Sequence, residues 1–449
     1  MPASSLPNPI AAAQSLAAVE AAGPPRNREP TWYEASAGAA APRPPLAGDL
    51  KADVAIVGAG FVGTSAALHL ASRGLSVVVL ETRHVGGGGS GRNGGLMVPG
   101  PRRDQDWLEA KLGRDGAKAL WEMYLEARAH LRGLVTGHGI DCDMRDGFIH
   151  CAHKRAFVGP LADYAEKMAR DYGYTAMTPL DRAKTAEAVG SEAYHGALYD
   201  ADGGHVHPLK LVRGIARAAE AKGAVIHEAT RVLSVDEVAG GVEVRTATGR
   251  VRAGMAILAT NGYSEGLAAD LDRHVMPIEA YVIATEPLPE PLRSQILPRR
   301  PSVSDTRFVV NYFRVSADHR MVFGGGETYG AGHPADIGAF VRPYMLSIYP
   351  QLRDIPVAYG WSGRIGITPN RMPFVRRLSP HVLTAAGLSG QGVVLGPYYG
   401  QVLAEAVAGT MERFDRLAAL DVPVFPGGRR FRLPMLMAAL TFYAIRDRL

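Results

Sequence analysis

The chain has 449 residues, of which 47% are hydrophobic, and its 49 basic and 44 acidic residues give a net charge of +5. This length can supply cores for two or three globular domains. The small positive excess gives no reason to expect a nucleic-acid partner, and no stretch of about 18 uninterrupted apolar residues predicts a membrane-spanning helix.

The first 50 residues are rich in alanine and proline. They lack the charged start, apolar core and cleavage site of a secretory signal. We expect residues 1–30 to form a disordered segment, in which 11–22 could make a weak helix. The next segment, 31–35, carries Trp32 and Tyr33. We expect it to pack on the domain that follows, with a free tail as an equal alternative.

Residues 53–81 have the pattern of a strand, a glycine-rich turn, a helix and a second strand. The turn is GAGFVG, where Gly58 permits a tight bend, Gly60 lets a pyrophosphate approach the backbone, and Gly63 lets the helix pack closely on the strand. The phosphates would lie at the positive end of the helix. Glu81, which ends the second strand, is placed to bind ribose hydroxyls and to repel the 2′-phosphate of NADP. The pattern predicts a dinucleotide site.

A second glycine-rich segment, RHVGGGGSGRNGG at 83–95, begins two residues after Glu81. NAD has no need for such a loop. FAD extends a flavin past the pyrophosphate, and a backbone that runs close under a planar ring needs residues without side chains. The loop therefore favours FAD over NAD, with a flexible surface linker as the alternative.

The middle of the chain predicts a second domain that begins near residue 101 and a return to the first. The second domain would start with one or two helices over 107–137, a strand over 147–151 and a helix over 155–172. The returning elements are a helix over 209–222, a strand over 224–227, a hairpin over 241–252 and a buried strand over 255–259.

Strands dominate residues 276–349, with β-rich segments at 279–286, 307–315 and 319–323. We expect these to form an antiparallel sheet over a cavity. The last third returns to the first domain through a strand, a glycine turn and a helix over 397–409, whose N-terminus would stabilise negative charge. Residues 426–449 predict a C-terminal helical tail. Docking on the body is favoured over peripheral membrane contact, because the apolar run is too short to span.

Four blocks carry a resemblance to a known family: the first glycine turn with its acid, the loop at 83–95, residues 361–370 and residues 382–393. Over 31–449 the chain resembles the D-amino-acid oxidase (DAO) superfamily of FAD-dependent oxidoreductases, most closely its gamma-glutamylputrescine oxidoreductase branch. The resemblance implies an α/β fold of the glutathione-reductase type. Its Rossmann-like FAD-binding domain would be discontinuous, over 31–100, 200–275 and 355–425, with a β-rich α+β substrate domain over 101–199 and 276–354.

The resemblance also implies which residues bind FAD. The first group is Gly58, Gly60, Phe61, Val62, Gly63, Glu81, Thr82, Arg83, Gly88, Gly89, Ser90, Arg92, Asn93, Gly94, Gly95 and Leu96. The second is Val232, Thr260, Asn261, Gly262, Gly363, Gly387, Ser389, Gly390, Gln391, Gly392 and Val393. Neither Cys142 nor Cys151 lies in these segments, so we expect the FAD to be non-covalent. Two cysteines are too few for a disulfide framework, which favours a cytoplasmic protein.

The family's reaction is oxidation of an amine at the carbon that bears nitrogen. A hydride passes to flavin N5, and water hydrolyses the resulting imine to an aldehyde or ketone. If the substrate carries a carboxylate, an arginine suits it best, because the guanidinium group can donate two parallel hydrogen bonds to it. Arg364 is the first candidate, ahead of Arg307 and Arg314, although an ordinary surface position is the favoured alternative for each.

Three further residues are candidates for the substrate side of the flavin. Tyr281 and Tyr312 could form aromatic walls of the cavity, or could be ordinary strand residues. His207 could approach the flavin, or could only fix a turn.

Three functions remain open at this point. The first is oxidation of a small amine, such as a polyamine derivative or an N-alkyl amino acid, with oxygen as electron acceptor. The second is a D-amino-acid or glycine-type dehydrogenase that passes electrons to a partner or quinone. The third is a flavin-binding protein without catalysis. The sequence does not determine which amine is used or the oligomeric state.

Overall fold

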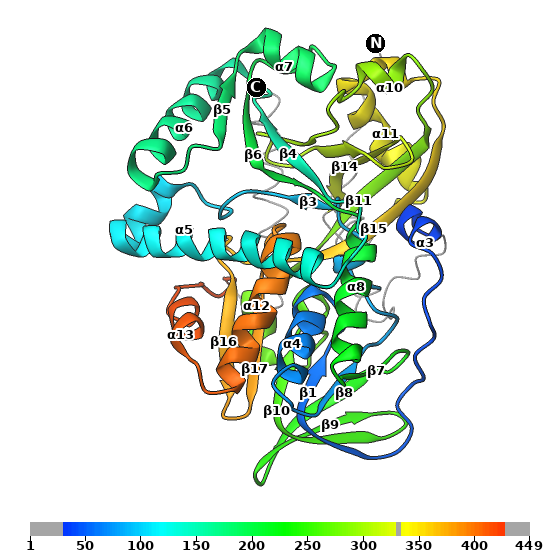
Figure 1. The fold of residues 1–449 in the computed structure, drawn as a ribbon, viewed down its shortest axis with the longest axis vertical. Coiled ribbons are helices and arrows are strands. Elements are labelled where there is room, and N and C mark those ends of the chain that lie inside the picture. Colours follow the sequence, from blue (N-terminus) through cyan, green and yellow to red (C-terminus); the bar gives the residue numbers. More distant parts are fainter. Residues whose placement is uncertain (1–29, 329–333, 427–449) are drawn as a thin grey trace.

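The computed structural model describes residues 30–328 and 334–426. Within these ranges the strands form two sheets, one of eight strands and one of nine. The eight-stranded sheet lies in the lower half of Figure 1 and the nine-stranded sheet in the upper half. The chain crosses between the halves several times, so each is built from segments that are far apart in the sequence.

The first sheet has the order β16-β17-β10-β1-β2-β7. Its strands are β1 (Leu50–Val57), β2 (Val77–Leu80), β7 (Val225–His227), β10 (Arg250–Leu258), β16 (Phe374–Ser379) and β17 (Val382–Ala386). Neighbouring strands pair in parallel across the sheet, except that the edge strand β16 pairs with β17 in antiparallel fashion. A hairpin of β8 (Val232–Val238) and β9 (Gly241–Thr246) joins the first half of β10. The predicted hairpin and the predicted buried strand thus share one long strand.

Three helices cover one face of this sheet: α4 (Phe61–Ala71), α8 (Pro208–Ala221) and α12 (Gly392–Val407). Ten of the eleven α4 residues are buried, because α4 lies between the other two helices and the sheet. The helix predicted over 397–409 begins five residues earlier, at Gly392, and contains Pro397. Proline is typical of a first helical turn, which is why the sequence pattern misplaced the start.

The second sheet has the order β15-β11-β14-β13-β12-β4-β6-β3, with β5 beside β6. Its strands are β3 (Leu96–Met97), β4 (Arg145–Cys151), β5 (Met177–Leu180), β6 (Ala197–His205), β11 (Met276–Pro287), β12 (Ser302–Asp305), β13 (Tyr312–Val315), β14 (Arg320–Thr328) and β15 (Val357–Ile367). All pairs are antiparallel except β4 with β12. The strand predicted over 307–315 is confirmed only at β13, since 307–311 forms a loop.

Further helices surround the second sheet and the ends of the first. They are α6 (Val158–Tyr172), α7 (Arg182–Val189), α9 (Ala269–His274), α10 (Leu292–Gln295), α11 (Ile337–Ile348) and α13 (Glu412–Ala418). The helix α11 packs on β11, β14 and β15, over a core that contains Tyr281, Phe313 and Phe323.

The long helix α5 (Gln105–Gly137) runs between the two halves in Figure 1. It bends at Gly113, whose φ is 72°, and it packs on α12.

The sheet pairing moves two of the expected domain boundaries. Boundaries at 200 and 355 cut through β6 and assign β15 to the FAD-binding domain, but both strands pair within the second sheet. Local patterns do not show which sheet a strand joins, because pairing is decided by distant neighbours.

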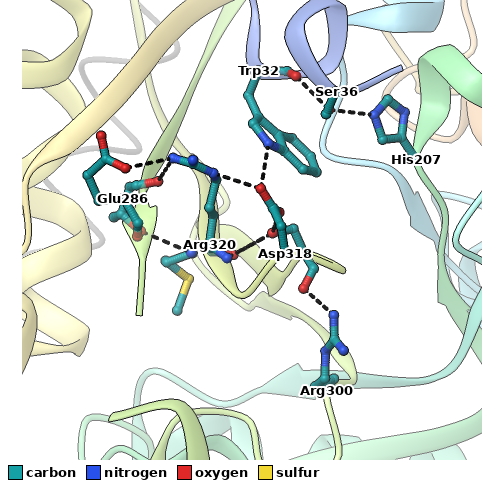
Figure 2. Close-up of polar contacts among 10 residues, drawn as sticks. Trp32, Ser36, His207, Glu286, Arg300, Asp318 and Arg320 are labelled. Atoms are coloured by element: carbon teal, nitrogen blue, oxygen red, sulfur yellow. Dashed lines mark hydrogen bonds and ion pairs between the residues drawn. The ribbon is translucent and has the colours of Figure 1, made fainter. Parts of the chain in front are cut away.

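The short helix α3 (Trp32–Ser36) precedes β1 and is docked on the body. Trp32 and Tyr33 are 3% and 0% exposed, so the expected packing is confirmed and the free tail is excluded. Figure 2 shows its contacts with both halves. The Trp32 indole Nε1 donates to Asp318 Oδ2 at 3.3 Å, next to β14, and Ser36 Oγ lies 3.0 Å from His207 Nε2, next to α8.

The predicted disorder before Pro30 and the predicted C-terminal helix lie almost wholly outside the described residues. Where the structure describes the chain, no helix has the length and apolar character needed to cross a bilayer. In the same ranges, no cluster of three or more histidine, cysteine or acidic side chains could hold a metal ion.

Candidate active site

A cavity of about 460 Å³ extends from the carboxyl edge of the first sheet to the second sheet. Glu81 and Val232 line one end, which we call the nucleotide end. Phe308, Val310 and Tyr312 line the other, which we call the substrate end. The glycine turn, the glycine loop and the N-terminus of α12 line the space between. The cavity therefore has the position expected of a ligand that spans both halves.

The first glycine turn is held by close backbone packing. Gly58 has a φ of 102°, a left-handed conformation that favours glycine, and its N–H donates to the Leu80 carbonyl at 2.8 Å. A Cβ on Gly63 would lie 1.9 Å from the Gly58 carbonyl oxygen. Gly63 thus allows close helix packing, as expected, but does not itself line the cavity. A Cβ on Gly60 would lie 2.8 Å from Ser90 Oγ.

Ser90 joins the second glycine loop to the first turn. Its hydroxyl accepts a hydrogen bond from the Phe61 amide at 3.0 Å, at the N-terminus of α4. Asn93 fixes the loop internally, because its side-chain amide donates to the Gly89 and Ser90 carbonyls and its oxygen accepts from the Gly95 amide. The loop is therefore an ordered wall of the cavity, which excludes the alternative of a flexible linker.

Glu81 lies at the nucleotide end, where it was expected. Its carboxylate accepts hydrogen bonds from the backbone amides of Ala59 at 2.8 Å and Arg83 at 2.9 Å. Burial raises the pKa of this carboxyl, although the two amides act in the opposite direction. A carboxylate has about four lone-pair sites, so these bonds leave capacity for ribose hydroxyls.

Two buried polar atoms of the cavity wall have no hydrogen-bond partner within the described residues: Thr260 Oγ1 and Gln391 Oε1. Buried polar groups are rarely left unsatisfied, so each such atom calls for an explanation. A ligand with polar groups along its length would supply the missing partners. Together with the first turns of α4 and α12, which line the cavity, these atoms fit FAD, whose diphosphate and flavin need donors and acceptors on opposite sides.

Arg364 lines the cavity, but its charge is already paired. Register between β11 and β15 sets it opposite Glu279, and its Nε lies 3.0 Å from Glu279 Oε1. Its Nη1 lies 3.5 Å from Glu265 Oε1, and its guanidinium lies 5.1 Å from the centre of the Tyr263 ring. Two carboxylates surround one arginine, so the structure does not give Arg364 the open fork expected of a carboxylate site.

The structure does not support the other two carboxylate candidates, Arg307 and Arg314. Both guanidinium groups already have partners, and neither faces the cavity. Arg307 pairs with the fully buried Asp305. Arg314 is 1% exposed, and its guanidinium donates to the Gly94 carbonyl at 2.8 Å and to the Tyr33 hydroxyl at 3.2 Å. Neither side chain lines the cavity.

Tyr312 lines the cavity, whereas Tyr281 and His207 do not. A Cβ on Gly324 would lie 2.0 Å from the Tyr312 ring, and one on Gly94 would lie 2.6 Å from it. The ring is thus held between the second sheet and the glycine loop. Tyr281 is on the opposite face of the sheet, in the core beside Phe340, because successive residues of a strand point to opposite faces.

His207 is the N-cap of α8, where Nδ1 accepts from the Lys210 amide at 3.2 Å. Its ring packs on Trp32 and Tyr33 of α3. The alternative reading, a histidine that fixes a turn, is the one that the structure supports. Burial lowers the pKa of His207 to about 3, with the charges of Arg314 and Lys210 acting in the same direction.

Most predicted FAD residues line the cavity. They are Gly58, Gly60, Phe61, Val62, Glu81, Thr82, Arg83, Gly88, Gly89, Ser90, Arg92, Asn93, Gly94, Leu96, Val232, Thr260, Asn261, Gly363, Ser389, Gly390, Gln391, Gly392 and Val393. Gly63, Gly95, Gly262 and Gly387 lie behind the wall, where side chains would meet neighbouring atoms.

Several wall residues lie outside the predicted set, among them Arg102, Tyr263, Glu279, Ser304 and Phe308. Most follow no glycine motif and come from strands or loops that only the fold brings together. Tyr263 is the exception. It directly follows the predicted Thr260-Asn261-Gly262 segment, so extending that motif by one residue would have included it.

Comparisons with known proteins agree with this geometry. The DAO family model, described as FAD dependent oxidoreductase, matches residues 53–406. The chain is 40% identical over 418 residues to a probable oxidoreductase OrdL of Rhizobium meliloti (strain 1021), which covers 93% of this chain and 97% of that protein. It is 38% identical over 420 residues to the gamma-glutamylputrescine oxidoreductase of Escherichia coli (strain K12), covering 93% of this chain and 98% of that one.

A solved structure of glycine oxidase from Geobacillus kaustophilus shares the fold, with a TM-score of 0.71 at 22% identity over 81% of this chain and 98% of that one. The expected fold, an FAD-binding Rossmann-like domain with a substrate domain, is therefore confirmed. The chain belongs to the DAO family of FAD-dependent oxidoreductases, enzymes that act on amines and amino acids.

Proposed function

We propose that this chain oxidises a small amine that carries a carboxylate, a polyamine derivative such as gamma-glutamylputrescine in first place and an N-alkyl amino acid in second. The amine would become an imine, which water hydrolyses to an aldehyde or ketone. Support for the polyamine derivative comes from the E. coli gamma-glutamylputrescine oxidoreductase, to which the chain is similar over nearly its full length. Bound FAD would supply the acceptor for the hydride that leaves the carbon.

The observation that carries the proposal is the composition of the substrate end. Phe308, Val310 and Tyr312 give it apolar and aromatic walls. Arg102 also lines the cavity and is close enough to His150 for its charge to lower the pKa of that ring. Apolar walls disfavour the ammonium form and so lower the pKa of a bound amine, which must be neutral to lose a hydride. No strong base is then required from the protein. An arginine at the same end would attract the carboxylate of the substrate.

Ser304 adds a polar group at the substrate end. Its hydroxyl lies 2.8 Å from His150 Nδ1 on the neighbouring strand β4. Burial lowers the pKa of His150 to about 4, and the positive charge of Arg102 acts in the same direction. A neutral His150 would hold the Ser304 hydroxyl in one orientation, ready to bind a polar group of the substrate.

We also propose that the FAD is bound without a covalent link and that the enzyme works in the cytoplasm. Cys142 and Cys151 are buried and unbridged, and neither lines the cavity. Burial raises the pKa of the Cys142 thiol to about 12 and also raises that of the Cys151 thiol well above its ordinary value, so neither is a ready nucleophile.

Anaerobic titration of the purified yellow protein with a panel of amines tests the function. We expect gamma-glutamylputrescine to bleach the flavin absorbance most rapidly, and N-alkyl amino acids more slowly. Readmitted oxygen should restore the colour and yield one hydrogen peroxide for each amine oxidised. Slow recovery in air with rapid recovery on adding a quinone would favour a dehydrogenase. Flavin that no amine bleaches would favour a non-catalytic protein, and material that stays colourless after reconstitution would contradict FAD binding.

A further inference from the structure

Besides the contacts with Asp318 and His207 shown in Figure 2, the helix α3 also contacts the glycine loop. The α3 residue that contacts the loop is Glu34. Glu34 Oε1 accepts a hydrogen bond from Arg92 Nη2 at 3.3 Å and lies 3.2 Å from His84 Nε2. Glu34 Oε2 accepts from the Thr31 amide at 2.8 Å, so the same carboxylate caps α3.

The Glu34 carboxyl is ionised over the whole working range of pH. Its partial burial would raise its pKa, but the hydrogen bond from His84, the Thr31 amide and the charge of Arg92 outweigh that effect and lower the pKa to about 2. The side chain is 23% exposed. Glu34 is therefore a fixed negative charge at the edge of the glycine loop.

Arg92 joins the glycine loop to the second sheet. It lines the cavity and its side chain is 3% exposed. Its Nε donates to the Gly87 carbonyl at 3.0 Å and its Nη1 to the Ser362 carbonyl at 3.5 Å, while its own carbonyl accepts from Trp361 Nε1 at 3.0 Å. Across the described ranges, Glu34 is the carboxylate that forms an ion pair with it.

A buried arginine that loses its carboxylate partner is costly, because the charge stays desolvated and one N–H loses its acceptor. At Arg92 the consequence would reach the cavity directly, since the same guanidinium holds Gly87 and the strand β15. Gly87 is directly followed by Gly88 and Gly89, which line the cavity, so a shift of Gly87 would move the cavity wall. The loop would then close less firmly around the cofactor.

We propose that Glu34 is a positioning residue of the cofactor site: it neutralises and orients Arg92, and so makes the segment before the first strand a working part of FAD retention. This role lies outside the glycine motifs that identify the family. It has two measurable consequences. Without Glu34 the cofactor leaves faster, and the local potential becomes more positive, which favours the reduced and more negatively charged cofactor.

The test compares Glu34→Gln with a matched variant, Glu109→Gln. Glu109 has a similar exposure, 26%, and pairs with Lys167 at 2.7 Å, and neither residue lines the cavity. For Glu34→Gln we expect FAD release, followed by the rise in free-flavin fluorescence, to be roughly tenfold faster, the size of one charge-assisted hydrogen bond. We expect the midpoint potential to rise by about 30 mV, which corresponds to a tenfold preference for the reduced form. Glu109→Gln should change neither.

Wild-type release and wild-type potential in Glu34→Gln would overturn the proposal, and so would equal changes in Glu109→Gln. Should Glu34→Gln yield no folded protein, Glu34→Asp gives the same test, with release several-fold faster than wild type expected and an unchanged rate overturning the idea. The release measurement depends on the non-covalent FAD proposed above. Yellow colour that stays with acid-denatured protein would refute that proposal by itself and leave the potential as the deciding measurement.

Discussion

The two ends of the cavity are built in different ways. From the nucleotide end to the glycine turn beside it, the wall is mostly backbone: glycines packed too closely against neighbouring atoms for side chains, with Glu81 held by two backbone amides. At the substrate end the wall is made of side chains from β12, β13 and the loop between them, namely Ser304, Phe308, Val310 and Tyr312. Substitutions should therefore act on FAD at one end and on substrate selection at the other.

Gly63→Ala should give the largest effect. The new Cβ would lie 1.9 Å from the Gly58 carbonyl oxygen, so α4 would move away from β1. We expect loss of bound FAD and a fall in the free energy of unfolding of at least about 3 kcal/mol. The matched change is Gly74→Ala, where φ is +82° but the added Cβ meets nothing within 4 Å. It should cost only about 1–2 kcal/mol and keep the flavin. Normal flavin content in Gly63→Ala would contradict the distinction.

Arg102→Gln should act at the other end. We expect KM for amines with a carboxylate to rise roughly 10- to 100-fold, the size of a lost charge-assisted hydrogen bond, with little change for matched amines that lack the carboxylate. Arg364→Gln is the informative contrast. It leaves Glu279 without its 3.0 Å partner, so it should reduce stability and FAD content without changing carboxylate selectivity. Equal effects of Arg102→Gln on both classes of amine would show that Arg102 binds no carboxylate.

Asp305→Asn should loosen the wall of the substrate end. The fully buried carboxylate accepts from the Arg307 and Asn311 amides and from Asn311 Nδ2, and so shapes the loop that carries Phe308 and Val310. An asparagine there turns an acceptor into a donor that faces other donors. We expect KM to rise several-fold, while the rate of FAD release stays at the wild-type value. Faster FAD release would mean that the two ends are not independent.

His207→Asn should act on the acid stability of the fold and not on the cavity. The folded protein holds His207 neutral, with a pKa of about 3, whereas the unfolded chain takes up a proton near 6.5. Stability that is present above pH 6.5 is therefore lost as the pH falls towards 3, by about 1.4 kcal/mol per pH unit for this one group. Asparagine keeps an N-cap acceptor but does not titrate. Urea unfolding at about pH 7 and pH 4 should show a shallower loss in the variant, and an equal loss would place the acid sensitivity elsewhere.

The same contrast explains how much could be predicted from the sequence. Motifs made of backbone are local: the turn at Gly58, the acid at Glu81 and the loop around Asn93 each need particular residues at fixed spacing. Their positions and the fold class followed from those spacings.

The substrate end has no such spacing. Whether Tyr281 or Tyr312 faces the cavity depends on strand alternation and on which sheet face meets the first half, and whether Arg364 is free depends on Glu279 across a strand pair. Glu34 and Arg92 are 58 residues apart in sequence. No local pattern relates such pairs, so their partnership is visible only in three dimensions.

The Tyr312 ring lies so close to Gly94 and Gly324 that neither position can carry a side chain while the tyrosine is present. The residues allowed at these three distant positions therefore depend on one another. A related chain that acquires a side chain at either glycine has no room for the tyrosine, so we expect the three positions to change together or not at all. Redesign of the pocket for a bulkier amine would have to begin by replacing Tyr312, and both glycines would then become open to larger residues.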